Sequence, residues 1–341
     1  MRDSSTPELD ETDRALVNVL QVAPRASWAE VGGALGIDPS TAARRWGRLN
    51  DAGLARVVAY PRLTGWSRHR CMAFVEVDCD PAARAEVIAD LVRTPRVASV
   101  TVASSGRDLY LTVLTPTLAA LSATVLGMTG VRTRTHLVTR LFTEGGSWRL
   151  DALSTDQRAA LHPLPDTIGA LPFADRDVLL ALADARRTTA EIAGLLGVST
   201  STARRRLTRK LRAGTLSLRC ETAQPVTGWP VSASFWARVR PHELPTIAAG
   251  LTTLPEIRMC AAVTGTDNLV VSLWLRSIAD SQRFEEQLST HFPTLTVTDR
   301  TIELRALKRM GCVLDDTGRS TTVIPVDPWA PAGQPSDALC P

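Results

Sequence analysis

The same short basic pattern occurs twice in this chain, and an internal repeat constrains the fold more than any single motif does. The first copy is residues 36–54, GIDPSTAARRWGRLNDAGL, and the second is residues 197–216, GVSTSTARRRLTRKLRAGTL. Aligned without gaps, both copies read Ser-Thr-Ala, then a pair of arginines, a further arginine and a closing glycine. Seven basic residues and no acidic residue lie between Arg204 and Arg219. The repeat therefore predicts two helical units of one kind.

Each copy predicts a tight turn followed by a basic helix. Ser199 is the N-cap candidate of the second helix, and Asp38 is that of the first. Ala203, Leu207 and Leu211 recur at the spacing of one buried helix face. The remaining faces carry arginines and small hydroxyl side chains. Such a helix can pack on a core and enter a DNA major groove, because arginine grips phosphate or the guanine edge with paired donors.

We therefore predict that the exposed faces of both helices bind DNA. The predicted DNA-binding residues are Ser40, Thr41, Arg44, Arg45, Arg48, Ser201, Thr202, Arg204, Arg205, Arg206 and Arg209. The first helix contains Gly47, and a glycine inside a helix costs about 1 kcal/mol relative to alanine. We expect the second helix to bind backbone phosphate more strongly, which implies an asymmetric DNA site. A basic helix is often only a solvated face, and the repeat is what favours DNA binding over that alternative.

Composition sets broad limits on the kind of protein. The 341 residues suffice for two to four small domains, and the net charge of +4 is modest. No apolar run is long enough to span a bilayer, and the polar, acidic N-terminus is unlike a signal peptide. The six cysteines form no Cys-x-x-Cys pair and have no histidine at ligand spacing. We expect a cytoplasmic protein with reduced thiols and without a metal or cofactor.

The expected elements around each basic helix follow one order. Two short helices and a tight turn precede the basic helix, which is the order of a helix-turn-helix unit. The strand formers of residues 54–60 then suggest a small wing. We place winged helix-turn-helix DNA-binding domains at residues 9–60 and 171–220, with a linker at residues 143–170.

Residues 68–142 and 230–310 each predict the order β-α-β-β-α-β. This order gives one antiparallel sheet with both helices on one face, so the other face needs a cover. Pairing of two such sheets, within one chain or between chains, is the simplest solution. The expected fold class is α+β, with the pair of domains repeated twice. Residues 1–8 and the Pro-, Ser-, Thr- and Gly-rich residues 315–341 are expected to be disordered.

The motif STxxRRxxRxxxxG, at residues 40–53 and 201–214, resembles the Lrp/AsnC (leucine-responsive, feast/famine) transcription regulators. The Gly-Trp pairs at residues 65–66 and 228–229 and the element order add to this resemblance, which covers residues 9–142 and 171–310. The resemblance implies a DNA-binding domain joined to a ligand-sensing domain. It also implies double-stranded DNA as partner, self-association through the sensing domains, and an effector such as an amino acid at their interface.

The resemblance also implies an effector site at a hairpin, where the family has Thr/Ser-Gly-x-x-Asp/Asn-Leu. Residues 264–269 fit this motif, whereas residues 105–109 lack a polar residue at the Asn268 position unless Asp108 substitutes after a shift of one residue. The implied effector-binding residues are Gly265, Thr266, Asp267, Asn268, Gly106 and Asp108. The alternative is that both segments are ordinary hairpin turns, since Gly and Asp favour turns.

Two other function classes compete with a sequence-specific regulator. Siroheme decarboxylases share a similar architecture and act on a tetrapyrrole with basic and histidine residues. The histidines here, His69, His136, His162, His242 and His291, form no cluster and no nucleophile-base spacing. His136 is the best single candidate, but a lone histidine in a strand is more often structural, so we predict no catalytic residue. An architectural protein that binds DNA with little sequence preference stays open.

Overall fold

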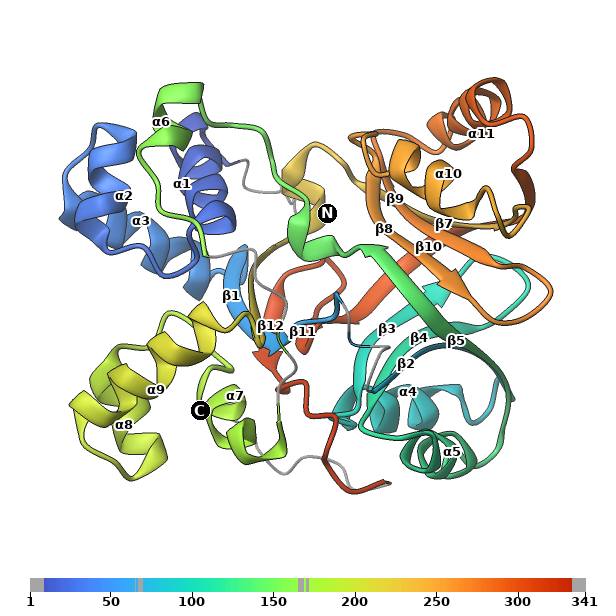
Figure 1. Cartoon of the computed structure of the whole chain (residues 1–341), viewed down its shortest axis with the longest axis horizontal. Coiled ribbons are helices and arrows are strands. Elements are labelled where there is room, and N and C mark those ends of the chain that lie inside the picture. Colours follow the sequence, from blue (N-terminus) through green and yellow to red (C-terminus); the bar gives the residue numbers. More distant parts are fainter. Residues whose placement is uncertain (1–8, 65, 67–69, 165–168, 170–171, 333–341) are drawn as a thin grey trace, which may run out of the picture.

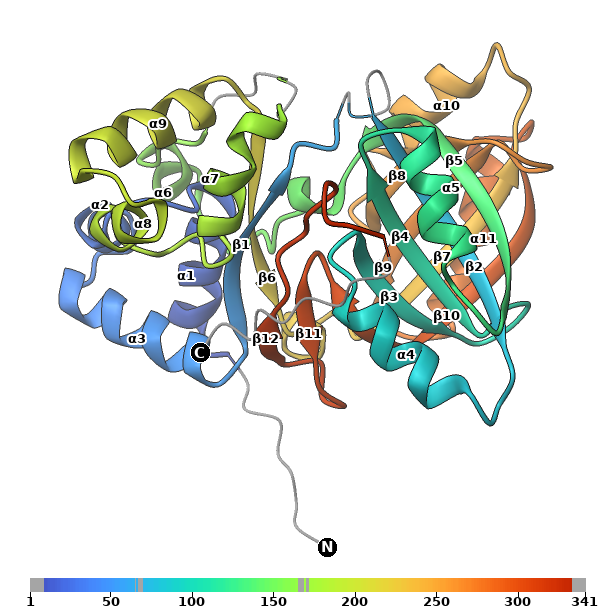
Figure 2. The same ribbon diagram turned by 90° about the horizontal axis from the view of Figure 1, so that it is seen from below.

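The computed structural model describes residues 9–64, 66, 70–164, 169 and 172–332 of the chain. Figure 1 shows two parts: a helical part that carries α1–α3 and α6–α9, and a part built on long strands with α4, α5, α10 and α11 outside them. The expected disorder of residues 1–8 lies outside the described residues. Two antiparallel strands, β1 and β6, run between the two parts (Figure 2).

Three helices and a strand open the chain: α1 (Glu11–Val22), α2 (Trp28–Leu35), α3 (Pro39–Asp51) and β1 (Ala55–Pro61). A short 3-10 turn (Phe173–Asp175) and the series α7 (Arg176–Ala181), α8 (Thr189–Leu196), α9 (Thr200–Arg212) and β6 (Leu216–Thr222) follow later in the same order. Capping boxes start α2 and α8, and left-handed glycines end both. Each tight turn therefore has the local chemistry that the repeat predicted.

The predicted wing is wrong. β1 pairs with β6 of the other helical unit, from Ala55 opposite Thr222 to Pro61 opposite Leu216. A strand that has no hairpin partner in its own unit satisfies its backbone groups with the matching strand of the second unit. The two strands form a ribbon that joins the two helix-turn-helix units, and one hydrophobic core runs through both units.

The strand-rich part contains two β-α-β-β-α-β series, in agreement with the expected order. The first is β2 (Cys71–Cys79), α4 (Arg84–Arg93), β3 (Val97–Ala103), β4 (Leu109–Thr115), α5 (Leu118–Leu126) and β5 (Val131–Thr143). The second is β7 (Val231–Arg238), α10 (Leu244–Leu251), β8 (Ile257–Val263), β9 (Leu269–Leu275), α11 (Asp280–His291) and β10 (Thr296–Arg309). Alternate residues of the strands pack under the helices in two separate cores.

The two sheets close into one barrel within the chain. β5 pairs with β8 at one seam, and β10 pairs with β3 at the other while also pairing with β7. The closed order is β10-β3-β4-β2-β5-β8-β9-β7, and every pairing is antiparallel. Closure removes open sheet edges and covers the sheet faces opposite the helices. The two sheets therefore cover each other inside a single chain.

The expectation of a disordered tail from Asp315 is wrong for residues 315–332. Strands β11 (Cys312–Leu314) and β12 (Ser320–Val323) extend the sheet beyond β10. Val326 and Asp327 are buried, and the carboxylate of Asp327 accepts a 2.8 Å hydrogen bond from the Nε of Arg176. Polar composition alone predicted disorder, but these few apolar and charged side chains dock the segment. Residues 333–341 lie outside the described residues.

Residues 143–164, which belong to the segment expected as a linker, are packed along the first helical unit. They contain a 3-10 turn (Gly145–Ser147) and α6 (Thr155–Ala159). The backbone amides of Leu150 and Ala152 donate to the side chains of Gln21 and Asn18, at 2.9 and 2.8 Å. These bonds satisfy two polar side chains that α1 buries. The connection between the halves is thus part of the core of the helical unit.

Three negative findings apply to the described part of the chain. There, no helix combines the length and apolar character needed to cross a membrane. Within the same ranges, no group of three or more His, Cys, Asp and Glu side chains is arranged to hold a metal ion. Cys71, Cys79, Cys220, Cys260 and Cys312 are unbonded thiols, and Cys340 lies outside the described residues.

Candidate functional site

The two predicted recognition helices lie on the surface of the helical part, at opposite ends of it in Figure 2. Helix α3 buries Ala42, Trp46 and Leu49 and starts at the side-chain cap of Asp38. Helix α9 buries Ala203 and Leu207, which were predicted to lie on its buried face. It starts at the side-chain cap of Ser199. Each helix therefore packs its apolar stripe on the core and keeps its basic faces outside.

The arginines of α3 are mostly neutralised by α1. Arg45 pairs with Asp10 and Asp13, at 2.7 and 2.9 Å, and Arg48 pairs with Asp13 at 2.6 Å. Asp13 is buried beneath them. Arg44 is exposed and makes no hydrogen bond or ion pair with any residue that the structure describes. Helix α3 thus offers one unpaired arginine to a ligand.

Helix α9 offers more unpaired charge. Arg206 forms two 2.9 Å hydrogen bonds with Asp177, and Lys210 pairs with Asp175. Four other arginines of α9 have no hydrogen bond or ion pair within the described ranges: Arg204, Arg205, Arg209 and Arg212. Helix α9 therefore has more unpaired arginines than α3, as expected if α9 is the stronger phosphate-binding helix.

The hydroxyl side chains at the helix starts have local partners. The hydroxyl of Ser40 donates to the capping carboxylate of Asp38 at 2.5 Å. Ser199 hydrogen-bonds the hydroxyls of Ser201 and Thr202, each at 3.0 Å. Ser40 and Ser201 are exposed, and Thr41 and Thr202 are half-buried. All four stand in the first turn of their helix, where the capping side chains bond the amides of Ser40 and Thr202.

Reciprocal contacts hold the two helical units together. The Nη2 of Arg25 donates to the carbonyl of Arg187 at 3.1 Å. Arg186 donates to the carbonyl of Ala26 at 2.7 Å and stacks on the ring of Trp28. Together with the β1–β6 ribbon, these bonds set the spacing of α3 and α9. A fixed spacing between two reading helices is what a DNA site with two half-sites requires.

The predicted effector residues lie at the ends of two equivalent hairpins, where the barrel has its seams. The Thr264 hydroxyl accepts a 2.9 Å hydrogen bond from the amide of Leu137 on β5. The Ser104 hydroxyl accepts a 3.1 Å bond from the amide of Ile302 on β10. Gly106 and Gly265 both have positive φ angles, of 72° and 126°. The hairpins therefore connect the two sheets.

Asp108 and Asn268 are bonded to their own sheets. The Asn268 side chain accepts from the amide of Val239 and donates to its carbonyl, at 2.9 and 2.7 Å. The Asp108 carboxylate accepts from the amide of Cys79 at 2.9 Å and from Arg84 at 2.7 Å. Thr266 is exposed, and Asp267 lies 3.7 Å from Arg238. Asp108 thus takes the place of Asn268 in the first half. This is the substitution expected if the motif of the first hairpin is shifted by one residue.

His136 lies in a buried polar cluster that sequence reasoning did not assemble. Its Nε2 is 3.6 Å from the Glu76 carboxylate, and its ring centroid is 4.6 Å from that of Trp236. Arg134 donates to Glu76 at 2.6 Å, and Arg107 lies 3.4 Å from it. Burial raises the pKa of Glu76, but the bonds from His136 and Arg134 and the charge of Arg107 outweigh burial and lower it to about 2.

One feature of the sequence could have indicated this cluster. Glu76 stands on the same strand face as the apolar residues Met72 and Phe74, where an acidic side chain needs a partner. The other histidines lie apart from this cluster: His162, His242 and His291 are exposed. His69 lies outside the described residues.

Comparisons with known proteins agree with this architecture. Residues 9–50 match the AsnC-type helix-turn-helix domain, and residues 232–312 match the Lrp/AsnC ligand binding domain. An uncharacterised HTH-type transcriptional regulator of Pyrococcus horikoshii is 29% identical over 119 residues, which cover 35% of this chain and 75% of the relative. An uncharacterised HTH-type transcriptional regulator of Pyrococcus abyssi is 28% identical over 119 residues, which again cover 35% of this chain and 75% of the relative.

A solved structure covers more of the chain. The siroheme decarboxylase NirDL matches 88% of this chain and 93% of its own, with a TM-score of 0.57 and 14% identity. At this identity the likeness shows the shared fold alone. The two domain matches are the more specific likeness: one stretch of the chain is similar to an AsnC-type helix-turn-helix domain and another to the Lrp/AsnC ligand binding domain.

Proposed function

We propose that the chain is a sequence-specific DNA-binding transcription regulator of the Lrp/AsnC type, made of two such units in tandem. The observation that carries the proposal is the pair of exposed basic helices, α3 and α9, joined by one ribbon. Their unpaired arginines supply phosphate contacts, and their outward faces present side chains that read base edges. The Pyrococcus proteins named as HTH-type transcriptional regulators support the same function.

The two helices differ, so the proposed DNA site is asymmetric. Helix α9 has four unpaired arginines, whereas α3 has Arg44 alone among the described residues. Because the halves are covalently linked, each chain carries one strong and one weak DNA-binding unit. Such a protein fits an operator with two unlike half-sites.

Effector control is the finer part of the proposal. The ligand would bind at the hairpins, through Gly106 in the first half and through Gly265, Thr266 and Asp267 in the second. Asp108 and Asn268 would shape these hairpins through their backbone bonds. A ligand changes DNA affinity only if it binds one arrangement of the two sheets more tightly than another.

DNA binding by fluorescence anisotropy tests the function. The probes are fragments from upstream of the protein's own gene, with a scrambled competitor, at several salt concentrations. We expect salt-sensitive binding that prefers the upstream fragment by about 10³ or more. Salt-sensitive binding without preference would instead indicate an architectural protein, and absence of binding at low salt would refute DNA binding altogether.

A further inference from the structure

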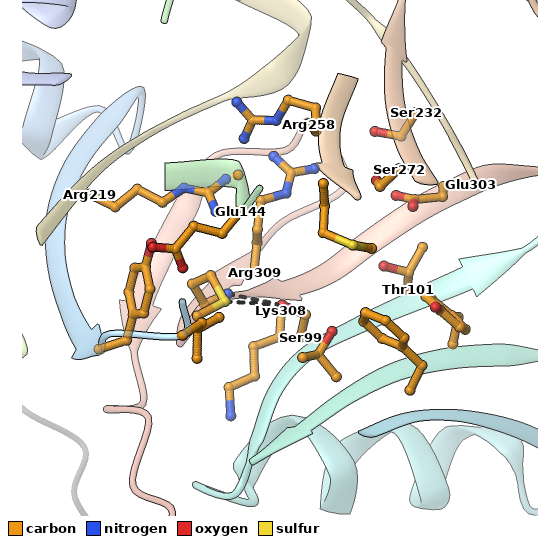
Figure 3. Close-up of a pocket in the computed structure, with 18 of the residues that line it drawn as sticks. Ser99, Thr101, Glu144, Arg219, Ser232, Arg258, Ser272, Glu303, Lys308 and Arg309 are labelled. Atoms are coloured by element: carbon orange, nitrogen blue, oxygen red, sulfur yellow. Dashed lines mark hydrogen bonds between the residues drawn. The ribbon is translucent and has the colours of Figure 1, made fainter. Parts of the chain in front are cut away.

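A cavity of about 130 Å³ lies where the barrel meets the ribbon (Figure 3). Strands of both sheets line it, through Ser99 and Thr101 on β3, Ser232 on β7, Arg258 on β8, Ser272 on β9 and Glu303 on β10. Tyr60 of β1, Arg219 of β6 and Glu144 complete the wall. An eight-stranded barrel leaves an interior that side chains fill or that holds one small ligand. This cavity is separate from the hairpins discussed above.

Arg258 is the most unusual side chain of the cavity. The residue is 6% exposed, and its guanidinium carbon lies 3.7 Å from the ring centroid of Trp274 and 4.8 Å from that of Trp148. It makes no hydrogen bond and no ion pair with any described residue. Burial, and then the nearby charge of Arg219, hold the pKa of Arg258 well below its usual value. A buried cation without a counter-ion is unfavourable unless something binds it.

Arg309 adds a second guanidinium to the same wall. Its guanidinium carbon lies 5.5 Å from the centroid of the Trp274 ring, so both arginines converge on one indole. Its Nη2 donates to the side-chain oxygen of Gln224 at 3.0 Å, and within the described ranges it has no carboxylate partner. Arg219, in contrast, pairs with Glu221. Two of the three arginines of the cavity therefore have no ion-pair partner among the described residues.

The carboxyl groups of the cavity are not ion-paired with these two arginines. Glu144 and Glu303 line the cavity, but in the described part of the chain no ion pair joins either of them to Arg258 or Arg309. Burial raises the pKa of both carboxyls, and the nearby charges of Arg309 and Arg258 oppose this rise at Glu303. The hydroxyls of Thr101 and Ser272 in the wall can donate a hydrogen bond to a ligand. The lining is thus rich in donors and in positive charge.

We propose that this cavity binds a small carboxylate, whose two oxygens accept hydrogen bonds from the guanidinium groups of Arg258 and Arg309. The planar guanidinium fork matches a carboxylate in geometry and sign. The hydroxyls of Thr101 and Ser272 hold the rest of the ligand. The proposal concerns ligand binding only and does not depend on DNA binding.

Calorimetry and thermal unfolding of the full chain test the proposal without DNA. The probes are sodium acetate and sodium succinate, with acetamide as the uncharged analogue, and with chloride and phosphate at equal ionic strength. We expect saturable binding of a carboxylate probe and a rise in the unfolding midpoint that grows with its concentration. Equal stabilisation by chloride or phosphate, or no binding of either carboxylate, would overturn the proposal.

Variants locate the binding. Arg258→Met should weaken carboxylate binding at least about tenfold, because it removes charge-assisted hydrogen bonds. Arg276→Met is the matched control: Arg276 also stacks on a tryptophan, Trp229, but is exposed and does not line the cavity. The control should bind as the wild type does.

A second variant covers the case in which Arg258→Met does not fold. Arg309→Gln keeps a side chain that can hydrogen-bond Gln224 but loses the charge, and it should also weaken binding about tenfold. If the folded cavity variants keep wild-type affinity, or if Arg276→Met loses as much as they do, the carboxylate binds elsewhere and the proposal is wrong.

Discussion

Asp108 and Asn268 occupy equivalent positions in the two halves, and each accepts a hydrogen bond from a backbone amide at the end of the first strand of its sheet, that of Cys79 or Val239. Asn268 also donates to the carbonyl of the same residue, Val239. Side chains that bond buried or half-buried backbone groups stabilise a fold whether or not a ligand is present. These two predicted effector residues therefore have a structural role in the unliganded chain.

The first prediction concerns Asn268. Replacing it with alanine leaves both backbone groups of Val239 unpaired, so Asn268→Ala should lower the free energy of unfolding by about 1–3 kcal/mol. Chemical unfolding of the two proteins in urea measures the difference. Thr266→Ala is the control on the same hairpin, because Thr266 is exposed, and it should change stability by less than about 0.5 kcal/mol. Equal effects of the two substitutions would contradict the structural role.

The second prediction compares the arginines of the two recognition helices. Alanine at Arg205, Arg206 and Arg209 removes two unpaired arginines, whereas alanine at the aligned Arg44, Arg45 and Arg48 removes one. Each lost phosphate contact should reduce the log-log salt slope of DNA binding by roughly 0.9. The α9 variant should therefore lose more affinity and more slope. An equal or larger loss in the α3 variant would show that the two helices do not differ in DNA binding as predicted.

The third prediction uses two glycines that differ in backbone conformation. A Cβ at Gly47, inside α3, or at Gly36, at the end of α2, would meet no atom within 4 Å. Gly47 is helical, so Gly47→Ala should stabilise the chain by about 0.5–1 kcal/mol. Gly36 has φ of 66°, so Gly36→Ala should destabilise it by roughly 1–2 kcal/mol. Thermal unfolding of both variants checks the opposite signs; a shared sign would refute the conformational explanation.

The fourth prediction concerns pH and Lys308. This side chain is fully buried, its Nζ donates to the carbonyl of Thr94 at 3.0 Å, and burial lowers its pKa to about 7. Since the unfolded chain holds this proton up to about pH 10.4, it binds more protons than the folded chain between about pH 7 and 10.4. Lys308 therefore makes stability rise with pH in that window, and its full penalty applies below pH 7.

Lys308→Met removes this titration. We expect the stability difference between the variant and the wild type to be largest at pH 7 and below and to shrink as pH rises toward 10.4. Urea unfolding across this pH range measures the free energy of unfolding of both proteins. The buried thiols are present in both, so their contribution cancels when one free energy is subtracted from the other. A constant difference across the range would show that Lys308 does not titrate differently in the two states.

Much of the local structure follows from short-range chemistry and was predictable. Asp38 and Ser199 cap the basic helices as expected, because a side-chain oxygen beside a helix start satisfies unpaired amides wherever it occurs. The apolar spacing of Ala203 and Leu207 likewise marks their buried face. Both β-α-β-β-α-β series follow from alternation and turn residues in the same way.

Pairing between distant segments was not predictable in this way. The strand after α3 has the same local pattern whether it folds as a wing or pairs with β6, and only the placement of the two helical units decides between them. The tail from Asp315 has a composition typical of disorder, yet Asp327 docks it on Arg176. The Glu76–His136–Trp236 cluster joins residues from β2, β5 and β7, which no spacing along the chain relates.

The sequence by itself determined the helices, their caps, the order of the strands and the basic surface of α3 and α9, because these depend on neighbours within a few residues. Only the tertiary structure decided that the two sheets close on each other in one chain. It also decided that Asp13 and Asp177 pair with some arginines, while others have no ion pair with a described residue. It also placed the unpaired Arg258 between Trp148 and Trp274. Burial and charge pairing depend on which distant surfaces meet, and that is settled by the packing of the whole chain.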